Sequence, residues 1–243
     1  MATYFSTMPI WAIVLFIPGF LYSISFIANP AKQAALNAGM TLQKSRNIQM
    51  GIFAFYIIYL AYASILSLNG VFYVVSVPPK VTIFTSLPLA IILFVIVGNT
   101  SLFKKLLQSI SLESLIAMHV FRVLGVFFIL LYYYHLLPMA FSFSAGFGDI
   151  TVALLALPVA KMVAKGKPGN RVVAYAWNIL GALDIITLLT IAVITSAATI
   201  NSGELKDMEM TTFPFVWFPA FAPATVLFLH ATIFRKLQQT KAK

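Results

Sequence analysis

The sequence contains no cysteine, and only 9% of its 243 residues are charged. The lack of cysteine excludes disulfide bonds, thiolate metal sites and a cysteine nucleophile. A soluble domain carries roughly a quarter charged residues, so the shortage of charge argues against a soluble fold. Hydrophobic residues make up 61% of the chain, and the mean hydropathy is +0.96. This composition indicates an integral membrane protein.

The motifs of several enzyme classes are also missing. The chain has no GxSxG, Walker or HExxH pattern, which are typical of α/β-hydrolases, P-loop proteins and zinc proteases. Its three histidines, His119, His135 and His230, do not have the spacing of zinc ligands. We therefore predict no metal site and no catalytic residues, and an enzyme is the less favoured class.

Seven segments are apolar and long enough to cross a bilayer, which takes about 20 residues. The first one follows no basic n-region and is too long for a signal-peptide core, so we interpret it as a spanning helix. The loops are short, so we predict one all-α, polytopic transmembrane domain over residues 1–243. The predicted spans are 8–28, 50–73, 81–99, 115–137, 140–163, 172–198 and 213–235.

The distribution of basic residues predicts the orientation of this bundle. On one side, the loops and the C-terminal tail hold Lys32, Lys44, Arg46, Lys104, Lys105, Lys161, Lys165, Lys167, Arg171, Arg235, Lys236, Lys241 and Lys243. The loops on the other side hold only Lys80 and Lys206. The positive-inside rule then places the N-terminus outside and the C-terminus in the cytoplasm. The net charge of +10 thus reflects topology and attraction to anionic lipid headgroups, and we predict no nucleic-acid partner.

Two pairs of spans have similar sequences. The segment GFLYSISFIANPAK (19–32) resembles GFGDITVALLALPVAK (146–161), and SLFKKLLQS (101–109) resembles TIFRKLQQT (232–240). One interpretation is a parallel three-helix repeat with halves 1–110 and 138–243 and the fourth span as linker, as found in some transporters. The other is chance likeness between apolar helices that end in basic residues.

Three charged residues lie within predicted spans: Arg122, Asp149 and Asp184. Charges inside a membrane are costly, face the bundle interior and normally pair. At about 1.5 Å per residue, Asp149 and Asp184 lie roughly 18 Å from the inner boundary and Arg122 roughly 10 Å. We therefore expect one arginine and two carboxylates to meet near the membrane midplane.

The same site includes neighbours of Asp184 on the sixth span. Trp177, Gly181 and Asp184 share one stripe at helical spacing, and Asn178 borders it. The polar set is interpreted either as a substrate or proton site or as a structural salt bridge that fixes helix register. Because two acids face one base, one carboxylate is left without its own cation and would take up a proton.

His119 and His230 suggest a second interpretation of the interior. Both lie at similar distances from the inner boundary, roughly 6 and 8 Å, on different spans. Two histidines at equal depth are the arrangement that bis-histidine ligation of haem b requires. Packing or proton-relay histidines would show the same pattern, so we expect no cofactor unless the two spans face each other across a haem-sized gap.

The run FRVLGVFFILLYYYHLLPMAFSFSAGFGDI (121–150), with LHATIFRKL near the end, resembles a group of uncharacterised seven-helix bacterial inner-membrane proteins. The shared features are an arginine in span 4, a Leu-Pro corner, an Ala-Gly-x-Gly-Asp run and a late Leu-His. The resemblance implies a bacterial inner-membrane location and brings no established activity. The architecture also looks like that of opsins and of three-plus-one-plus-three transporters, although span 7 has no lysine for a retinal Schiff base.

Three hypotheses on function follow from these observations. The leading one is a small transporter or permease, proton-coupled through Asp149 or Asp184, with a small-molecule or ion substrate bound near Arg122. The second is a haem b cytochrome with His119 and His230 as axial ligands. The third is a membrane sensor or assembly partner in which the charged residues are structural. The oligomeric state is left open.

Overall fold

The structure is a computed structural model that describes residues 4–166, 168–202 and 208–239. The described residues contain no β-strand; an isolated bridge between Phe5 and Phe213 is their one pairing of strand type. Seven helical segments are long and apolar enough to cross a membrane, which confirms the all-α class and the seven spans. They are Ile10–Asn37, Leu42–Leu68, Thr82–Asn99, Leu112–Tyr133, Met139–Ala164, Asn170–Ala198 and Trp217–Gln239.

Several spans consist of more than one helical element. In chain order the elements are α1 (Ile10–Ser23), α2 (Ser25–Asn37), α3 (Leu42–Leu68), η1 (Thr82–Ser86), α4 (Leu87–Ile91), η2 (Ile92–Ile96), η3 (Val97–Asn99), α5 (Ser101–Ser109), α6 (Leu112–Ala117), η4 (Met118–Gly125), α7 (Val126–Tyr133), α8 (Met139–Ala164), α9 (Asn170–Ser202), η5 (Met208–Thr211) and α10 (Trp217–Gln239). The labels η mark short stretches of 3₁₀ or π geometry.

Boundaries of four predicted spans were wrong by four residues or more. The second span, expected at 50–73, is Leu42–Leu68, and the fourth, expected at 115–137, is Leu112–Tyr133. The first and the last spans also differ. The first was expected to end at residue 28, but helix α2 continues to Asn37. The apolar run ends there, yet the alanines that follow are the best helix formers, so the helix continues beyond the hydrocarbon boundary. The last span was expected to begin at residue 213, but α10 begins at Trp217. Pro214 precedes it in a non-helical turn, because proline biases the residue before it away from helical geometry.

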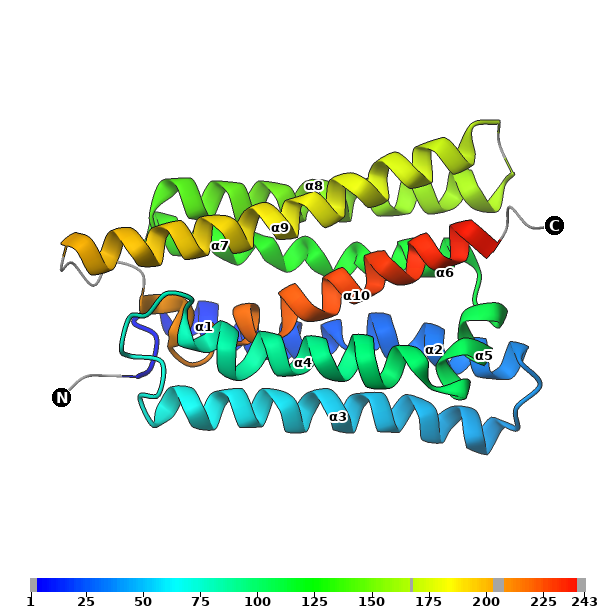
Figure 1. Ribbon diagram of the computed structural model, residues 1–243, viewed down its shortest axis with the longest axis horizontal. Helices are drawn as coiled ribbons and strands as arrows, with labels where there is room; N and C mark the ends of the chain where they lie inside the picture. The colour runs from blue at the N-terminus through cyan, green and yellow to red at the C-terminus, as the bar shows by residue number, and fades with distance from the viewer. Residues whose placement is uncertain (1–3, 167, 203–207, 240–243) are drawn as a thin grey trace.

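The helices pack in two groups with α10 between them (Figure 1). The group drawn in green and yellow contains α6, η4, α7, α8 and α9, and α8 packs against all four of the others. The second group contains α1 to α5. Helix α10 contacts α9 and α6 on one side and α3 and α4 on the other. It is the most deeply buried of the seven spans, whereas α9 is the most exposed to the surroundings.

Phenylalanine fills the core between these groups. Phe16 of α1 packs against Phe127 of α7 and Phe218 of α10, with ring centroids 5.1 Å apart in both pairs. Phe128 and Phe218 are closer, at 4.3 Å. Aromatic packing of this kind adds to the stabilisation from burial alone. These side chains hold α1, α7 and α10 together on one side of the charged residues.

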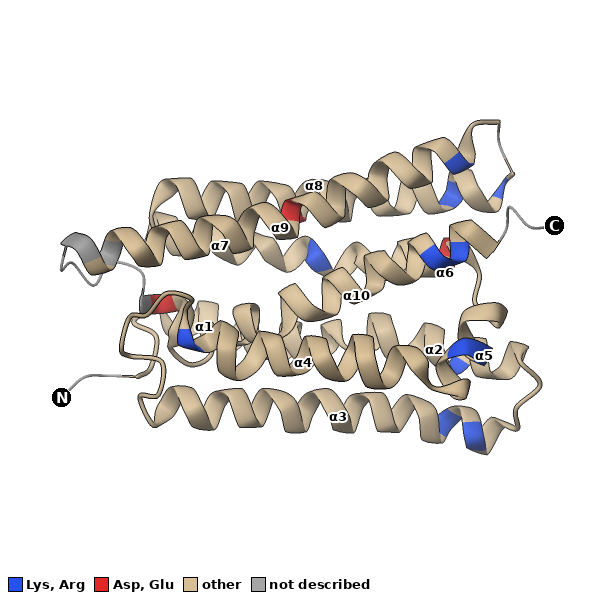
Figure 2. Ribbon diagram, viewed as in Figure 1, with Lys and Arg blue, Asp and Glu red and all other residues tan. Residues whose placement is uncertain are grey.

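Most lysines and arginines of the described residues gather at one end of the bundle (Figure 2). Lys80 lies near the start of η1, and Arg122 lies on η4 inside the fourth span. The α2–α3 loop, α5, the end of α8 and the end of α10 all meet at the basic end (Figure 1). The helices that begin there are capped: Thr41 and Ser111 accept hydrogen bonds from the backbone of Lys44 and Ser114. Lys167, Lys206, Lys241 and Lys243 lie outside the described residues. The predicted orientation depends on this asymmetry and stays a prediction.

Candidate functional site

Arg122 lies on a short 3₁₀ stretch, η4, inside the fourth span. In a 3₁₀ helix the side chains three residues apart lie directly above one another. His119, Arg122 and Gly125 therefore share one face, and all three are buried. A 3₁₀ stretch within a span often marks a functional or strained position. The Arg122 side chain is 1% exposed, so the guanidinium is sealed inside the bundle.

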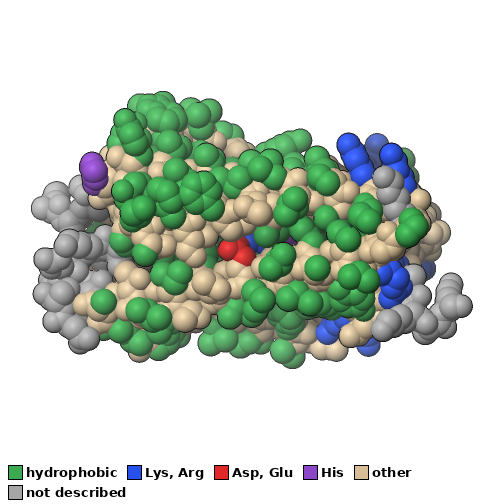
Figure 3. Space-filling view, turned by 90° about the horizontal axis from the view of Figure 1, so that it is seen from above, with side chains coloured by type: hydrophobic (Ala, Val, Ile, Leu, Met, Phe, Trp, Pro, Cys, Tyr) green, Lys and Arg blue, Asp and Glu red, His purple; other side chains and the backbone are tan. Residues whose placement is uncertain are grey.

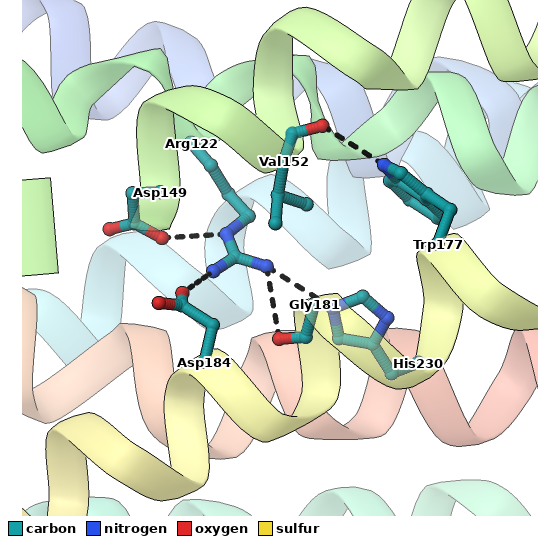
Figure 4. Close-up of polar contacts among 7 residues, drawn as sticks. All are labelled: Arg122, Asp149, Val152, Trp177, Gly181, Asp184 and His230. Carbon is teal, nitrogen blue, oxygen red and sulfur yellow. Dashed lines mark hydrogen bonds and ion pairs between the residues drawn. The ribbon is translucent and has the colours of Figure 1, made fainter. Parts of the chain in front are cut away.

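Two carboxylates from different helices bind this guanidinium (Figure 4). Asp149 of α8 accepts a hydrogen bond from Arg122 Nε at 2.6 Å. Asp184 of α9 accepts from Arg122 Nη2. The structure thus brings together the arginine and both acids that the sequence singles out. Ion pairs that combine charge and hydrogen bonding are the strongest kind of polar contact in a protein.

Glycines let the three helices approach closely enough for these contacts. A Cβ atom on Gly125 would lie 2.5 Å from Asp149 Cβ, and one on Gly148 would lie 1.7 Å from Asp184 Oδ1. Both distances are shorter than any tolerated contact, so each carboxylate occupies space that a larger residue would fill. Small residues at helix interfaces have this effect in membrane proteins. Gly125 was not predicted as a site residue. Its position three residues after Arg122, in a 3₁₀ stretch, is the signal that could have identified it.

Arg122 also contacts Gly181 of α9 and His230 of α10. Its Nη1 donates to the carbonyl of Gly181 at 3.3 Å and lies 3.2 Å from His230 Nε2. Because a guanidinium has only donors, His230 Nε2 accepts, and the ring proton is on Nδ1. That proton is donated to Asn178 Oδ1 at 2.8 Å, and Asn178 Nδ2 donates in turn to the His230 carbonyl at 3.1 Å. His230 is thus held as a neutral imidazole.

Trp177 takes no part in this network of side-chain contacts to Arg122. Its indole Nε1 donates to the carbonyl of Val152 on α8, at 3.2 Å (Figure 4). The ring packs edge-on against His119, with centroids 5.2 Å apart. Trp177 therefore links α9 to α8 through a hydrogen bond next to the charged residues.

His119 and His230 do not fit a bis-histidine haem. Such a haem needs its iron and porphyrin between the two ligand nitrogens. The two rings lie in direct contact, with centroids 4.2 Å apart and planes inclined by 35°, so no porphyrin fits between them. Both nitrogens of His230 are already hydrogen-bonded. Among the described residues, no group of three or more His, Asp or Glu is placed to hold a metal ion.

A cavity connects Asp149 to the end of the bundle opposite the basic loops. Its volume is about 110 Å³, enough for several water molecules or a small solute. Pro79, Met210 and Thr211 line it at the end of the bundle, and Asp149 lines it as well. Its walls are mainly apolar, with four hydroxyl side chains besides Thr211: Thr82, Ser86, Thr195 and Ser196. Sequence reasoning missed these hydroxyls, because serine and threonine are common in spans and nothing in their spacing marks them.

A second, smaller cavity also borders Asp149. It has a volume of about 20 Å³, room for roughly one water molecule, and is lined by Arg122, Asp149 and Ser23 among apolar residues. Figure 3 shows acidic side-chain atoms at the bottom of a hollow midway along one face of the molecule. The Asp184 side chain is 16% exposed and that of Asp149 8%. Asp184 is therefore partly accessible, whereas Asp149 and Arg122 are buried.

Next to the first cavity, at the end of the bundle opposite the basic loops, Glu209 is buried in η5. Burial raises the pKa of the Glu209 carboxyl, and hydrogen bonds from Ser6 and Thr212 partly oppose this shift. Its Oε1 atom has no hydrogen-bond partner among the described residues. The next residue, Met210, lines the cavity.

Comparison of the chain with curated proteins and with solved structures gives no match. A family model described as Domain of unknown function (DUF8737) matches residues 78–238. The matched region includes Arg122, both aspartates, Asn178 and His230, and it covers more than half of the chain. By this match, the chain belongs to the DUF8737 family.

Proposed function

We propose that this protein is a small membrane transporter, in which Asp149 binds the proton or the cationic group of a substrate that enters from the outer end. The observation that carries the proposal is the cavity of about 110 Å³ that ends at the Asp149 carboxylate. A carboxylate that is ion-paired on one side and faces a cavity on the other has a free oxygen for a ligand. Asp149 contacts Arg122 through Oδ1, which leaves Oδ2 for this role.

The charge of the site supports the same proposal. One guanidinium faces two carboxylates, so the group carries one excess negative charge when both acids are ionised. A buried charge without a partner is very costly, and a proton or a substrate cation would neutralise it. Ionisable residues inside a membrane typically mark substrate and proton pathways. Exchange of a proton for a cationic substrate at this position is the coupling that we propose.

The expected orientation fits this direction of entry. With the basic end in the cytoplasm, the cavity opens to the outside, and Arg122, His119 and His230 lie between it and the cytoplasmic face. The parallel repeat of residues 1–110 and 138–243 would place the site next to the linker span, since the sites of repeat transporters lie at the repeat interface. For the bacterial inner membrane, the outside is the periplasm.

Reconstituted protein gives a direct test. Liposomes with an acidic interior and a trapped pH-sensitive dye are given an outward proton gradient, and proton efflux is measured while amines, amino acids and inorganic cations are added to the outside one class at a time. We expect at least one class to accelerate the flux, and Asp149→Asn to abolish this response. Asp184→Asn should reduce it, because Asp184 competes for the same arginine.

Glu113→Gln is the matched control, since Glu113 is an exposed acid at the start of α6. It should leave the flux unchanged. If no solute class alters proton flux, or if Asp149→Asn responds like the wild type, the transport proposal is wrong. Monodisperse elution of each variant in detergent verifies that a lost response is not caused by misfolding.

A structural role for the charged residues is the second candidate, and one observation favours it. Arg122 uses three of its nitrogens in contacts to Asp149, Asp184, Gly181 and His230. Under this sensor or assembly role, joint replacement of Arg122 by Leu and Asp149 by Ala would retain function if the variant folds. Under the transport role it would remove all solute-dependent flux.

A further inference from the structure

A large apolar cavity lies at the basic end of the bundle, away from the charged site. Its volume is about 560 Å³, within the range of about 300–1,000 Å³ that is typical of small-molecule sites. It lies between α2, α3, α5 and α10, and residues from Asn47 to Tyr56 of α3 form one wall. At 1.5 Å per residue, the distance along α3 from Asn47 to Tyr56 is about 14 Å. The cavity is therefore long and reaches well into the membrane-spanning region.

A second hollow adjoins this cavity at the end of the bundle. It has a volume of about 360 Å³, and Lys44 and Lys105 both line it. The two cavities share Asn47, Ile48 and Leu102 in their walls. A basic hollow thus continues directly into an apolar channel, and one molecule can occupy both.

Lys44 and Lys105 are available for such a molecule. Both are exposed, and neither forms an ion pair with an acidic residue of the described chain. Lys44 lies in the first turn of α3, and Lys105 lies on α5, a short helix at the same end (Figure 2). Helix α5 is amphipathic: Phe103, Leu106 and Leu107 line the apolar cavity, while Lys105 lines the basic hollow. This separation of charge and apolar surface matches the two parts of a phospholipid.

The geometry points to a specific binding site for an anionic phospholipid. Its headgroup phosphate lies between Lys44 and Lys105, and one acyl chain enters the cavity between α3 and α10. Gly51 of α3 lines the cavity, and an added Cβ atom there would meet nothing within 4 Å. The acyl chain of the lipid passes over this glycine. This site is separate from Arg122 and the aspartates and does not depend on the transport proposal.

Native mass spectrometry of the full chain in detergent tests this inference. Phosphatidylglycerol and phosphatidylcholine of identical acyl composition are titrated separately, and the dissociation constant of the first bound lipid is compared. We expect tighter binding of phosphatidylglycerol. Joint Lys44→Gln and Lys105→Gln substitution should weaken phosphatidylglycerol binding by about fivefold for each lysine and leave phosphatidylcholine binding unchanged.

Gly51→Leu tests the acyl-chain part of the site, since its side chain would fill the cavity. It should weaken the binding of both lipids. Lys161→Gln with Lys165→Gln is the matched control, because both lysines are exposed at the same end of the bundle, at the end of α8. As a measurement on the wild type alone, phosphatidylglycerol with a photoreactive acyl chain should crosslink to α3 or α10.

Several results would overturn the inference. Equal binding of the two lipids would remove the headgroup preference, and an unchanged preference in the Lys44/Lys105 variant would place it elsewhere. Displacement of phosphatidylglycerol by excess inorganic phosphate would indicate a site for a free anion instead of a lipid. Crosslinks confined to the exposed face of α9 would indicate non-specific annular lipid.

Discussion

The two buried histidines, His119 and His230, differ in their hydrogen bonding although their rings are in contact. His119 is fully buried, and neither of its ring nitrogens has a hydrogen-bond partner among the described residues. His230 has partners at both nitrogens, Arg122 and Asn178. A buried polar group without a partner destabilises a fold, whereas removal of a bonded one leaves its partners unsatisfied. The two positions should therefore respond differently to the same substitution.

We expect His119→Phe to raise the free energy of unfolding by about 1 kcal/mol, since it removes an unpaired polar group and keeps the aromatic ring. His230→Phe should lower it by about 2 kcal/mol, because Arg122 and Asn178 each lose a partner. Thermal unfolding of the purified proteins in detergent measures both. A larger loss for His119→Phe than for His230→Phe would contradict this difference.

Glu209 makes the stability of the protein depend on pH. Below the ordinary pKa of glutamate, its carboxyl is protonated in both the folded and the unfolded chain, so it adds no pH dependence to the stability there. Because burial raises the pKa in the folded chain, stability falls as the pH rises through the raised value, where the folded chain must ionise a buried group.

Glu209→Gln should remove this loss. The unfolding temperature of the variant should exceed that of the wild type above the raised pKa, and the difference should shrink as the pH is lowered. Thermal unfolding at a series of pH values measures the difference, with Glu113→Gln as the control for an exposed acid. A difference that grows towards acidic pH would show the opposite sign and refute this account.

At the scale of the elements, the close contact of α8 and α9 depends on Gly148. A methyl group there would overlap with Asp184 and push it away from Arg122. Overpacking of a filled interior costs typically about 1–3 kcal/mol. The length and apolar character of the spans were predictable from sequence because they are properties of consecutive residues. The close approach was not, since it depends on how each helix is rotated about its axis.

Gly148→Ala should therefore lower the free energy of unfolding by about 1–3 kcal/mol and reduce solute-dependent proton flux. Gly51→Ala is the matched control within another span. Nothing lies within 4 Å of its added Cβ atom, so it should be neutral or stabilise the helix by up to about 1 kcal/mol. Equal effects of the two substitutions on unfolding would show that the contact with Asp184 is not the cause.

The positions of residues along the spans explain which contacts in the site could be predicted from sequence. Depth estimates along the predicted spans were sufficient to bring Arg122, Asp149 and Asp184 to similar levels. They could not separate a haem-sized gap from direct contact between His119 and His230, because depth carries no information on lateral distance. The 3₁₀ geometry around Arg122 was also beyond sequence reasoning, since the segment is as apolar as a regular helix.

For the whole molecule, the asymmetry of charge is the feature with the widest consequence. It predicts that the basic end faces the cytoplasm. The absence of cysteine makes a direct test simple, since a single introduced cysteine carries the entire label. Val74 lies in the loop at the opposite end, and Gln43 lies at the start of α3; both are exposed.

In intact cells, a membrane-impermeant maleimide should label Val74→Cys, and Gln43→Cys should react only after the membrane is permeabilised. For a bacterial inner membrane, the outer membrane is first made permeable to the reagent. The reverse pattern would invert the orientation, and the cavity at Asp149 would then open to the cytoplasm. The repeat halves, 1–110 and 138–243, and the single domain stay predictions.

The sequence by itself determined the class of this protein, the number of its spans and the asymmetry of its two ends. These features follow from hydropathy and charge summed along the chain, so they do not require knowledge of neighbours. Only the tertiary structure decided that Arg122 is shared between Asp149, Asp184 and His230, and that a cavity reaches Asp149 from one end. Those contacts depend on helix rotation and on glycines that admit a neighbouring side chain, and both are set by packing between distant segments.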